Sequence, residues 1–153
     1  MKNYAVYRLK YGNFLIEEAG GAITGITKTD ENTTDFGTPT PLTDSVAEEL
    51  REYFSGKRKK FTFKYELHGT EFQKKVWREL TKIPYGETRT YGQIAAEIGN
   101  PKASRAVGMA NNRNPIVIAV PCHRVIGANG SLTGYAYGIE MKENLLEMEK
   151  KNK

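Results

Sequence analysis

The sequence has few of the residues that build disulfides and metal sites. Its 153 residues include one cysteine, Cys122, and only two histidines. A single cysteine excludes an internal disulfide, and a structural zinc site usually takes about two to four cysteine ligands. We therefore expect neither a disulfide nor a bound metal ion.

Long apolar runs are also missing. No stretch approaches the roughly 20 apolar residues that a membrane-spanning helix needs. Residues 1–12 mix charged and aromatic side chains and lack the apolar core of a secretory signal. The balance of 39% hydrophobic and 27% charged residues is typical of a soluble globular protein. We expect no membrane partner and a place in the cytoplasm of a bacterial or archaeal cell.

Negative charge is in deficit. The net charge is +5, and the isoelectric point is about 9.2. Such a balance suits a polyanion such as DNA, and a solvated lysine-rich surface explains it equally well. For the basic run at residues 57–60, a solvated loop is favoured over a DNA contact.

The N-terminal part is predicted to be mainly β-structure. Three short runs with partial alternation, 4–9, 13–18 and 22–27, are separated by glycine-containing turns. Residues 28–42 are predicted to form a loop. A capping box at 45–48 then indicates a helix that ends near Gly56. Clean alternation at 61–65 predicts a last strand.

Beyond about residue 66 the patterns become helical. Capping boxes at 70–73 and 90–93 each predict a helix start, and Asn100-Pro101 predicts an N-cap with a proline at the first helical position. Two short helices joined by Gly99-Asn100 are laid out as in a helix-turn-helix, whose second helix enters a groove of DNA. An ordinary two-helix corner of a core is the alternative. We predict an α+β protein with a β-rich domain at 1–66 and a helical domain at 67–153.

The residues around the only cysteine suggest chemistry. An apolar run at 116–120, typical of a buried strand or turn, leads to Cys122-His123-Arg124. A lone cysteine is most often a small buried hydrophobe. A neighbouring imidazole or cation can give it the thiolate character that a nucleophile needs. The residues alone leave both interpretations open. Four carboxylates near the C-terminus could orient the imidazole: Glu140, Glu143, Glu147 and Glu149.

The segment from Pro121 to Ile126 resembles the acceptor motif of the O6-alkylguanine-DNA alkyltransferases. Further matches in family order and spacing are at 72–80, 83–88, 90–91, 100–101, 105–108, 114–115, 134–135, 142 and 145–146. The resemblance covers the chain after about residue 66. The first 66 residues resemble the family only in outline, as a small ribonuclease-H-like β/α domain.

The resemblance implies direct reversal of DNA damage. A methyl or other alkyl group would move from guanine O6 in duplex DNA to Cys122, irreversibly and once per molecule, and O4-alkylthymine is a second candidate substrate. A base edge inside a duplex is out of reach of a buried thiol, so the nucleotide must be extruded. No cofactor is implied, and the protein is expected to be a monomer.

The resemblance also assigns catalytic roles. Cys122 corresponds to the alkyl acceptor, and His123 to its base, which acts through a water molecule while Glu149 orients the imidazole. Tyr91 corresponds to the residue that crowds the phosphate, rotates the nucleotide outward and protonates the departing guanine. Asn114 corresponds to the hinge between the recognition helix and the acceptor segment.

Further residues are assigned to DNA and to the alkyl pocket. Arg105 corresponds to the finger that fills the vacated place in the base stack. Without the resemblance, Arg105 would be a surface arginine and Tyr91 a core aromatic. The remaining predicted DNA contacts are Tyr91, Gly92, Asn100, Lys102, Ser104, Ala106 and Arg113. The predicted pocket residues are Tyr91, Met109, Pro121, Val125, Tyr135, Ala136 and Tyr137.

One departure from the family pattern and three alternatives remain. Ala136 and Tyr137 stand where many relatives have serine or alanine followed by glycine, which alters the predicted pocket rim. A non-catalytic helix-turn-helix protein that recognises alkylated DNA is the main alternative. Alkyltransferase-like proteins that lack the acceptor are disfavoured by Cys122, since they typically carry tryptophan there. A Cys-His hydrolase would turn over on esters or amides, whereas an alkyl acceptor is consumed.

Overall fold

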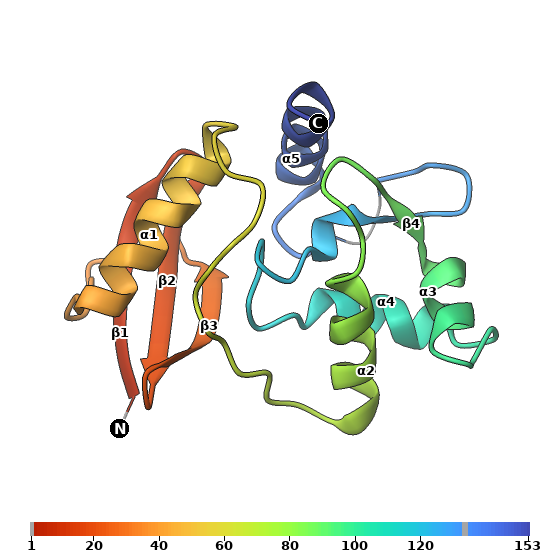
Figure 1. Ribbon diagram of the computed structural model, residues 1–153, viewed down its shortest axis with the longest axis horizontal. Coiled ribbons are helices and arrows are strands. Elements are labelled where there is room, and N and C mark those ends of the chain that lie inside the picture. Colours follow the sequence, from red (N-terminus) through yellow and green to blue (C-terminus); the bar gives the residue numbers. More distant parts are fainter. Residues whose placement is uncertain (1, 133–134) are drawn as a thin grey trace. The chain divides into compact units, whose positions relative to one another are not determined.

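The computed structural model describes residues 2–132 and 135–153 and divides the chain into two compact units (Figure 1). The first comprises Met1–His68 and Pro115–Val117, and the second Gly69–Asn114 and Ile118–Lys153. The predicted second domain, 67–153, included the short stretch 115–117. The structure places that stretch in the first unit instead, because it pairs with a strand there.

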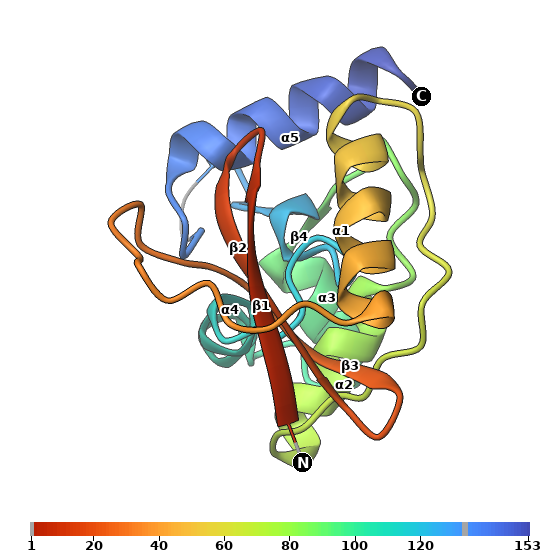
Figure 2. The same ribbon diagram turned by 90° about the vertical axis from the view of Figure 1, so that its left-hand side faces the viewer.

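The first unit is a three-stranded antiparallel sheet with one helix. The strands, in the order β1-β2-β3, are β1 (Lys2–Leu9), β2 (Gly12–Ala19) and β3 (Ala22–Lys28). Gly20 and Gly21, with φ of 61° and 81°, form the tight β2–β3 turn, for which glycine has no steric penalty. The helix α1 (Pro41–Phe54) packs against β1 and β2 and covers one face of the sheet (Figure 2).

The start of α1 differs from the prediction of a capping box at 45–48. The helix begins at Pro41 with Thr40 as its N-cap: the Thr40 hydroxyl accepts from Thr43 N, and the Thr43 hydroxyl accepts from Thr40 N at 2.9 Å. Ser45 instead donates its hydroxyl hydrogen bond to the carbonyl of Leu42. The reciprocal cap was missed because a threonine stands where the usual capping box has glutamate or glutamine.

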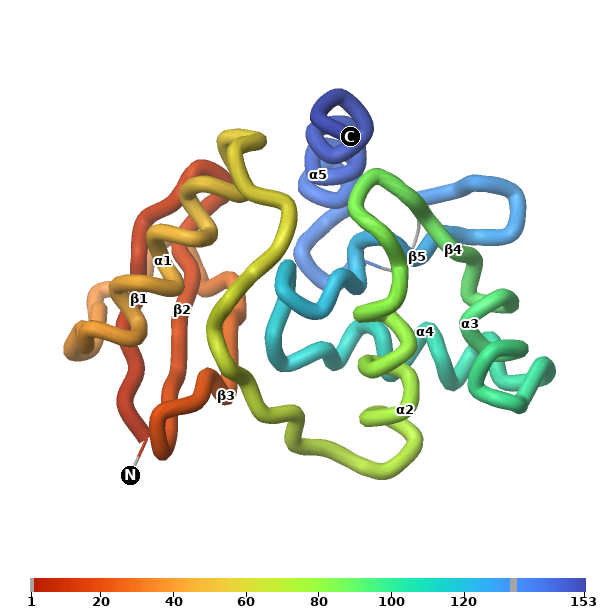
Figure 3. Tube along the Cα trace, in the orientation of Figure 1, coloured from red at the N-terminus to blue at the C-terminus, as the bar shows by residue number. Residues whose placement is uncertain are grey.

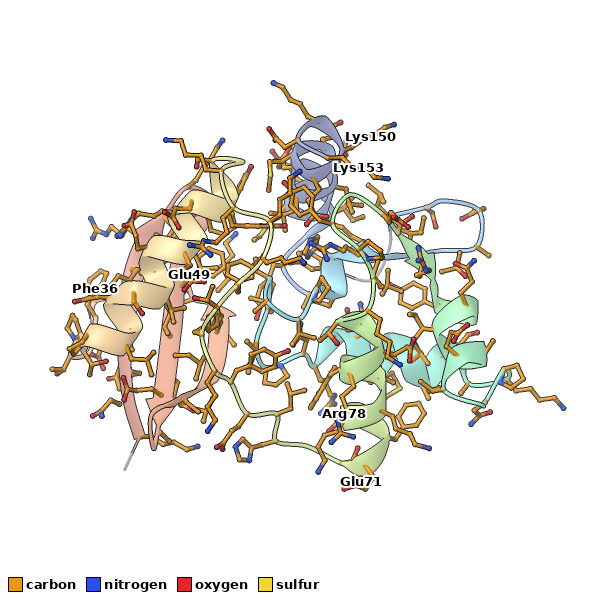
Figure 4. The ribbon with its side chains drawn as sticks, viewed as in Figure 1. Phe36, Glu49, Glu71, Arg78, Lys150 and Lys153 are labelled. Carbon is orange, nitrogen blue, oxygen red and sulfur yellow. The ribbon has the colours of Figure 1, made fainter. Side chains whose placement is uncertain are left out.

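The predicted strand at 61–65 is also wrong. Only Tyr65 makes a bridge, with Ile23, and this segment and 115–117 each make a short parallel pairing with β3. Ile23 N donates to Lys64 O, and Ile26 N donates to Pro115 O, both at 2.9 Å. Glu49 of α1, labelled in Figure 4, accepts from Thr62 N at 2.8 Å and from Thr62 Oγ1 at 2.7 Å. These hydrogen bonds fix the chain after the helix.

The second unit is mainly helical. Its elements are α2 (Glu71–Leu80), β4 (Arg89–Thr90), α3 (Tyr91–Glu97), α4 (Ser104–Asn112), the 3-10 helix η1 (Cys122–Arg124), β5 (Val125–Ile126) and α5 (Ile139–Lys151). The capping boxes at Thr70 and Thr90 are confirmed. The prediction that Asn100-Pro101 starts the next helix is wrong. That helix, α4, begins at Ser104, and Asn100 O instead accepts from Ala103 N in the preceding turn.

Helices α2, α3 and α4 pack on one another, and the two-residue strands β4 and β5 pair in parallel. Because β4 leads directly into Tyr91, this pairing brings the start of α3 close to the end of the segment that carries Cys122. Figure 3 shows the path of that segment from α4 into β5. The described residues thus form a mixed α/β protein with a small antiparallel sheet and five α-helices. In this part of the chain, no helix is long and apolar enough to cross a membrane.

Candidate active site

The cysteine lies at the end of a buried, strained turn. Ile118 has φ of 74°, a left-handed conformation that is costly for a β-branched residue. The turn leads through Val120 to Cys122 at the first position of η1, where the cysteine is 3% exposed. Strain of this kind persists only where the surrounding structure enforces it, and it is concentrated at functional sites.

The thiol is held in its protonated form. Burial raises the pKa of Cys122 to about 11, although a hydrogen bond from Asn114, the charge of Lys142 and nearby backbone N–H groups act in the opposite direction. At neutral pH the nucleophile must therefore lose a proton to a base before it reacts.

A base stands next to it in the chain. His123 Nε2 lies 2.7 Å from Glu149 Oε2, and both side chains are fully buried. Burial lowers the pKa of His123, so the imidazole is neutral at rest. Burial alone would raise the pKa of Glu149, but the hydrogen bonds from His123 and Arg124 and the charge of Arg124 outweigh it and hold this pKa well below its usual range. Of the four carboxylates considered from the sequence, only Glu149 is buried.

Arg124 completes this buried network. Its guanidinium donates to Glu149 through Nε at 2.8 Å and through NH2 at 2.9 Å, and its NH1 donates to the carbonyl of Ile83 at 2.8 Å. Such a two-point contact fixes the carboxylate geometrically. Arg124 therefore binds both oxygens of Glu149, and the imidazole of His123 shares Oε2 with the guanidinium.

The C-terminal end of α4 and the residues just after it are hydrogen-bonded to the segment that carries Cys122. Asn114 Nδ2 donates to Val120 O at 2.6 Å, and Asn111 Nδ2 donates to Cys122 O at 3.2 Å. These contacts join the predicted recognition helix directly to the segment that carries the thiol.

A buried lysine lies beside the thiol. Lys142 of α5 is fully buried, donates to the carbonyl of Val125, and has its ammonium 5.9 Å from the ring centre of Tyr91 and 6.0 Å from that of Tyr135. Burial lowers the pKa of Lys142 to about 8, and Cys122 acts against that shift. Burial, with a smaller contribution from Cys122, raises the pKa of Tyr91.

The predicted DNA contacts are mostly exposed and lie on α3, α4 and the turn between them. Arg105, Ala106 and Arg113 are exposed, as are Gly92, Asn100 and Lys102, and Ser104 is partly buried. A Cβ on Gly92 would lie 3.8 Å from Ser104 Oγ, so the N-terminal ends of α3 and α4 approach each other closely.

The residues predicted to line the alkyl pocket differ in how deeply they are buried. Pro121, Val125 and Tyr135 are buried, Tyr137 is half-buried with its ring edge-on to Tyr135 at 5.9 Å, and Ala136 is exposed. Met109, which was also predicted to line the pocket, does not share their burial. It is 63% exposed and lines a groove of about 280 Å³ with residues of α2 and α4, none of which belongs to the cluster around Cys122. Met109 points outward because Val107 and Ala110 occupy the buried face of α4.

Sequence reasoning assigned no role to Lys142 or Asn111, and it considered Arg124 only as a cation near the thiol, whereas the structure shows Arg124 bound to Glu149. A signal existed for the lysine, because Lys142 shares the buried face of α5 with Met141, Leu145 and Glu149. Their spacing is that of one helical face. No comparable local signal marks Asn111. Among the described residues, no group of three or more His, Cys, Asp or Glu side chains is placed to hold a metal ion.

A buried cysteine with a histidine–carboxylate pair beside it defines a class of proteins in which the thiol is the reactive group. A family model, the DNA-binding domain of 6-O-methylguanine DNA methyltransferase, matches residues 71–151. The chain is 67% identical over 104 residues to the methylated-DNA–protein-cysteine methyltransferase of Methanosarcina acetivorans, an alignment that covers 68% of this chain and 67% of the relative. The chain belongs to the methylated-DNA–protein-cysteine methyltransferase family.

Solved structures agree over nearly the whole chain. The O6-methylguanine methyltransferase of Mycobacterium tuberculosis has a TM-score of 0.87 at 44% identity, with 100% of this chain and 95% of that chain covered. The OGT of the same organism in complex with DNA has a TM-score of 0.88 at 45% identity, covering 97% and 93%.

Proposed function

We propose that this protein repairs DNA by direct reversal, moving a methyl or small alkyl group from guanine O6 to Sγ of Cys122. The observation that carries the proposal is the buried Cys122–His123–Glu149 cluster in a chain of this family. Incubation with an O6-methylguanine oligonucleotide should add one methylene to the intact mass, and proteolysis should locate it on the peptide that contains Cys122. An unmodified mass, or an adduct on another peptide, would contradict the assignment.

His123 is the base in this mechanism. Its Nε2 is bound to Glu149, so the thiol proton passes through a water molecule to the other ring nitrogen, Nδ1. The Glu149 carboxylate then stabilises the imidazolium that forms. The ammonium of Lys142 lowers the cost of the thiolate while it exists.

The thiolate then attacks the alkyl carbon. The S–C bond forms as the C–O6 bond breaks, and the electron pair leaves with the guanine. Tyr91 donates its phenolic proton to the departing base, and the nearby Lys142 cation stabilises the phenolate. The proton held by His123 later returns to Tyr91. The product thioether has no route to hydrolysis, so each molecule acts once and needs no cofactor.

DNA binding is assigned to α3 and α4, which form a helix-turn-helix in this proposal. The exposed basic residues Lys102, Arg105 and Arg113 support it. Arg105 enters the base stack as the damaged nucleotide swings out, which offsets part of the extrusion cost. O6-alkylguanine in duplex DNA is the proposed substrate, with O4-alkylthymine as a competitor to be tested alongside it.

The N-terminal sheet with α1 is proposed to be the ribonuclease-H-like domain of the family, at residues 1–66, and the remainder the DNA-binding and acceptor domain. We further propose that the protein acts as a monomer in the cytoplasm. Sedimentation of the free protein and of its duplex complex tests the monomer.

A further inference from the structure

Asn111 is a polar residue at a position of α4 where the helical pattern predicts a buried apolar side chain. It lies on the last turn of α4, beside Val107 and Ala110, and is 1% exposed. Its Nδ2 donates to Cys122 O, but its Oδ1 has no hydrogen-bond partner among the described residues. A buried acceptor without a partner destabilises a protein, and an apolar side chain of similar size would avoid that cost.

The carbonyl that accepts this hydrogen bond lies between two functional residues. Cys122 O belongs to the peptide that joins Cys122 to His123. Holding this carbonyl therefore orients the backbone of the nucleophile and of its base together. The same carbonyl also accepts from the backbone N–H of Val125 at the end of the three-residue η1, so the Asn111 amide is its second donor.

The amide is itself held in place. Trp77 Nε1 donates to Ala110 O at 2.8 Å within the buried core, which anchors the last turn of α4. Asn114 Nδ2 donates to Val120 O just after the helix ends. Two amides, one in the last turn of α4 and one two residues beyond the helix, thus hold the carbonyls on either side of Pro121.

We propose that Asn111 is a positioning residue for alkyl transfer, because its amide holds the Cys122–His123 peptide in the orientation that aims the thiol and the imidazole. The inference rests on the function proposed above. The unpaired Oδ1 follows from this role, since an asparagine cannot supply the N–H without the oxygen. Departures from local packing rules are expected at functional sites.

Asn111→Leu is the decisive substitution. It removes both the donor and the unpaired oxygen and keeps the number and branching of the side-chain heavy atoms. The variant should melt at the wild-type temperature or above, and should bind an unmodified duplex with the wild-type Kd. Its single-turnover rate constant at saturating O6-methylguanine duplex should fall by about 10- to 100-fold, because small misalignments of reacting groups are costly. The reaction with free O6-methylguanine should fall by the same factor.

The pH dependence separates positioning from electrostatics. Alkylation of Cys122 by iodoacetamide should keep its wild-type pH midpoint in Asn111→Leu, because the amide is neutral and holds a carbonyl. Asn111→Asp should be slower still, since it replaces the donor with a charge that faces that carbonyl. Asn112→Leu is the matched control: the same substitution at the adjacent, exposed residue should leave the rate constant within about twofold of wild type.

Three results would overturn the inference. They are a wild-type rate constant in Asn111→Leu, a marked loss of melting temperature in that variant, and an equal loss of rate in Asn112→Leu. Each is distinguishable from failure of the proposed function, in which the wild-type protein itself gains no methyl group.

Discussion

The buried positions of the N-terminal sheet are mostly apolar, whereas those around Cys122 include several ionisable side chains. In the sheet, Phe14, Ile16 and Ile26 are completely buried. Around the thiol, the fully buried side chains include His123, Lys142 and Glu149. Burying ionisable groups costs free energy unless they are paired, and replacing them with well-packed apolar groups is often neutral or stabilising. Burial in the sheet therefore stabilises the fold. The buried ionisable groups around the thiol lower the stability and supply the chemistry.

The largest effect is expected at the thiol itself. Cys122→Ser should bind duplex DNA like the wild type and show no detectable methyl transfer, because a hydroxyl is not ionised at neutral pH and is a far weaker nucleophile than a thiolate. Binding is measured by fluorescence anisotropy and transfer by intact mass. Methyl transfer that persists in the serine variant would remove Cys122 from the acceptor role.

Arg105→Ala should separate DNA handling from chemistry. We expect a loss of about 100-fold with an O6-methylguanine duplex, because extrusion costs a few kcal/mol and each 1.4 kcal/mol is a factor of ten. The reaction with free O6-methylguanine requires no extrusion and should be unchanged. Equal losses in both single-turnover assays would make Arg105 a structural or pocket residue.

Lys142→Met tests the buried cation. Lys142 is charged below its pKa of about 8, where it favours the thiolate of Cys122, so its removal should slow iodoacetamide alkylation below about pH 8, by about tenfold for each 1.4 kcal/mol of lost charge interaction. Lys142→Arg, which keeps a charge, is the control. A wild-type alkylation rate below about pH 8 in Lys142→Met would mean that the lysine does not stabilise the thiolate.

The same substitution should also change how the free energy of unfolding depends on pH. The folded-state pKa of Lys142 is about 8, below its ordinary 10.5, so the unfolded chain binds more protons above pH 8 and the wild type gains stability as pH rises. This gain should be visible between about pH 8 and 9, because at higher pH the raised pKa of Cys122 acts in the opposite direction. Urea unfolding of Lys142→Met should show no such rise in the free energy of unfolding.

Tyr137→Gly should change the range of alkyl groups. The ring of Tyr137 lies edge-on to Tyr135, so we expect it to narrow the pocket against a benzyl group and to leave a methyl group unaffected. The glycine variant should react roughly 10- to 100-fold faster with O6-benzylguanine and at the wild-type rate with O6-methylguanine. A lower benzyl rate would indicate that the tyrosine stacks on the benzyl ring instead.

The smallest effect on chemistry is expected in the sheet. Ile16→Ala should lower the free energy of unfolding by about 2–5 kcal/mol through loss of buried contacts and a cavity. The transfer rate per folded molecule should stay at the wild-type value in conditions where the variant is folded. If the rate fell by more than the fraction of folded protein, the sheet would contribute to the chemistry as well as to stability.

Local chemistry explains which features could be predicted from the sequence. The capping boxes at Thr70 and Thr90 and the glycine turn after β2 depend on neighbouring residues alone, and they were identified correctly. The predicted strand at 61–65 was wrong because a strand also needs a partner, and only Tyr65 bridges to another segment. The choice of Glu149 among four carboxylates depends on where α5 packs. Asn111 and Lys142 are residue types that are usually exposed, so their burial is decided by tertiary contacts.

The stoichiometry of repair tests the central claim most directly. A fixed amount of protein is mixed with increasing excess of O6-methylguanine duplex, and restored guanine is counted when the reaction stops. The account predicts a plateau at one guanine per protein molecule, with every molecule carrying a methyl group on Cys122. Restored guanine that keeps accumulating beyond the amount of protein, or released methanol, would show a turning-over hydrolase and contradict it.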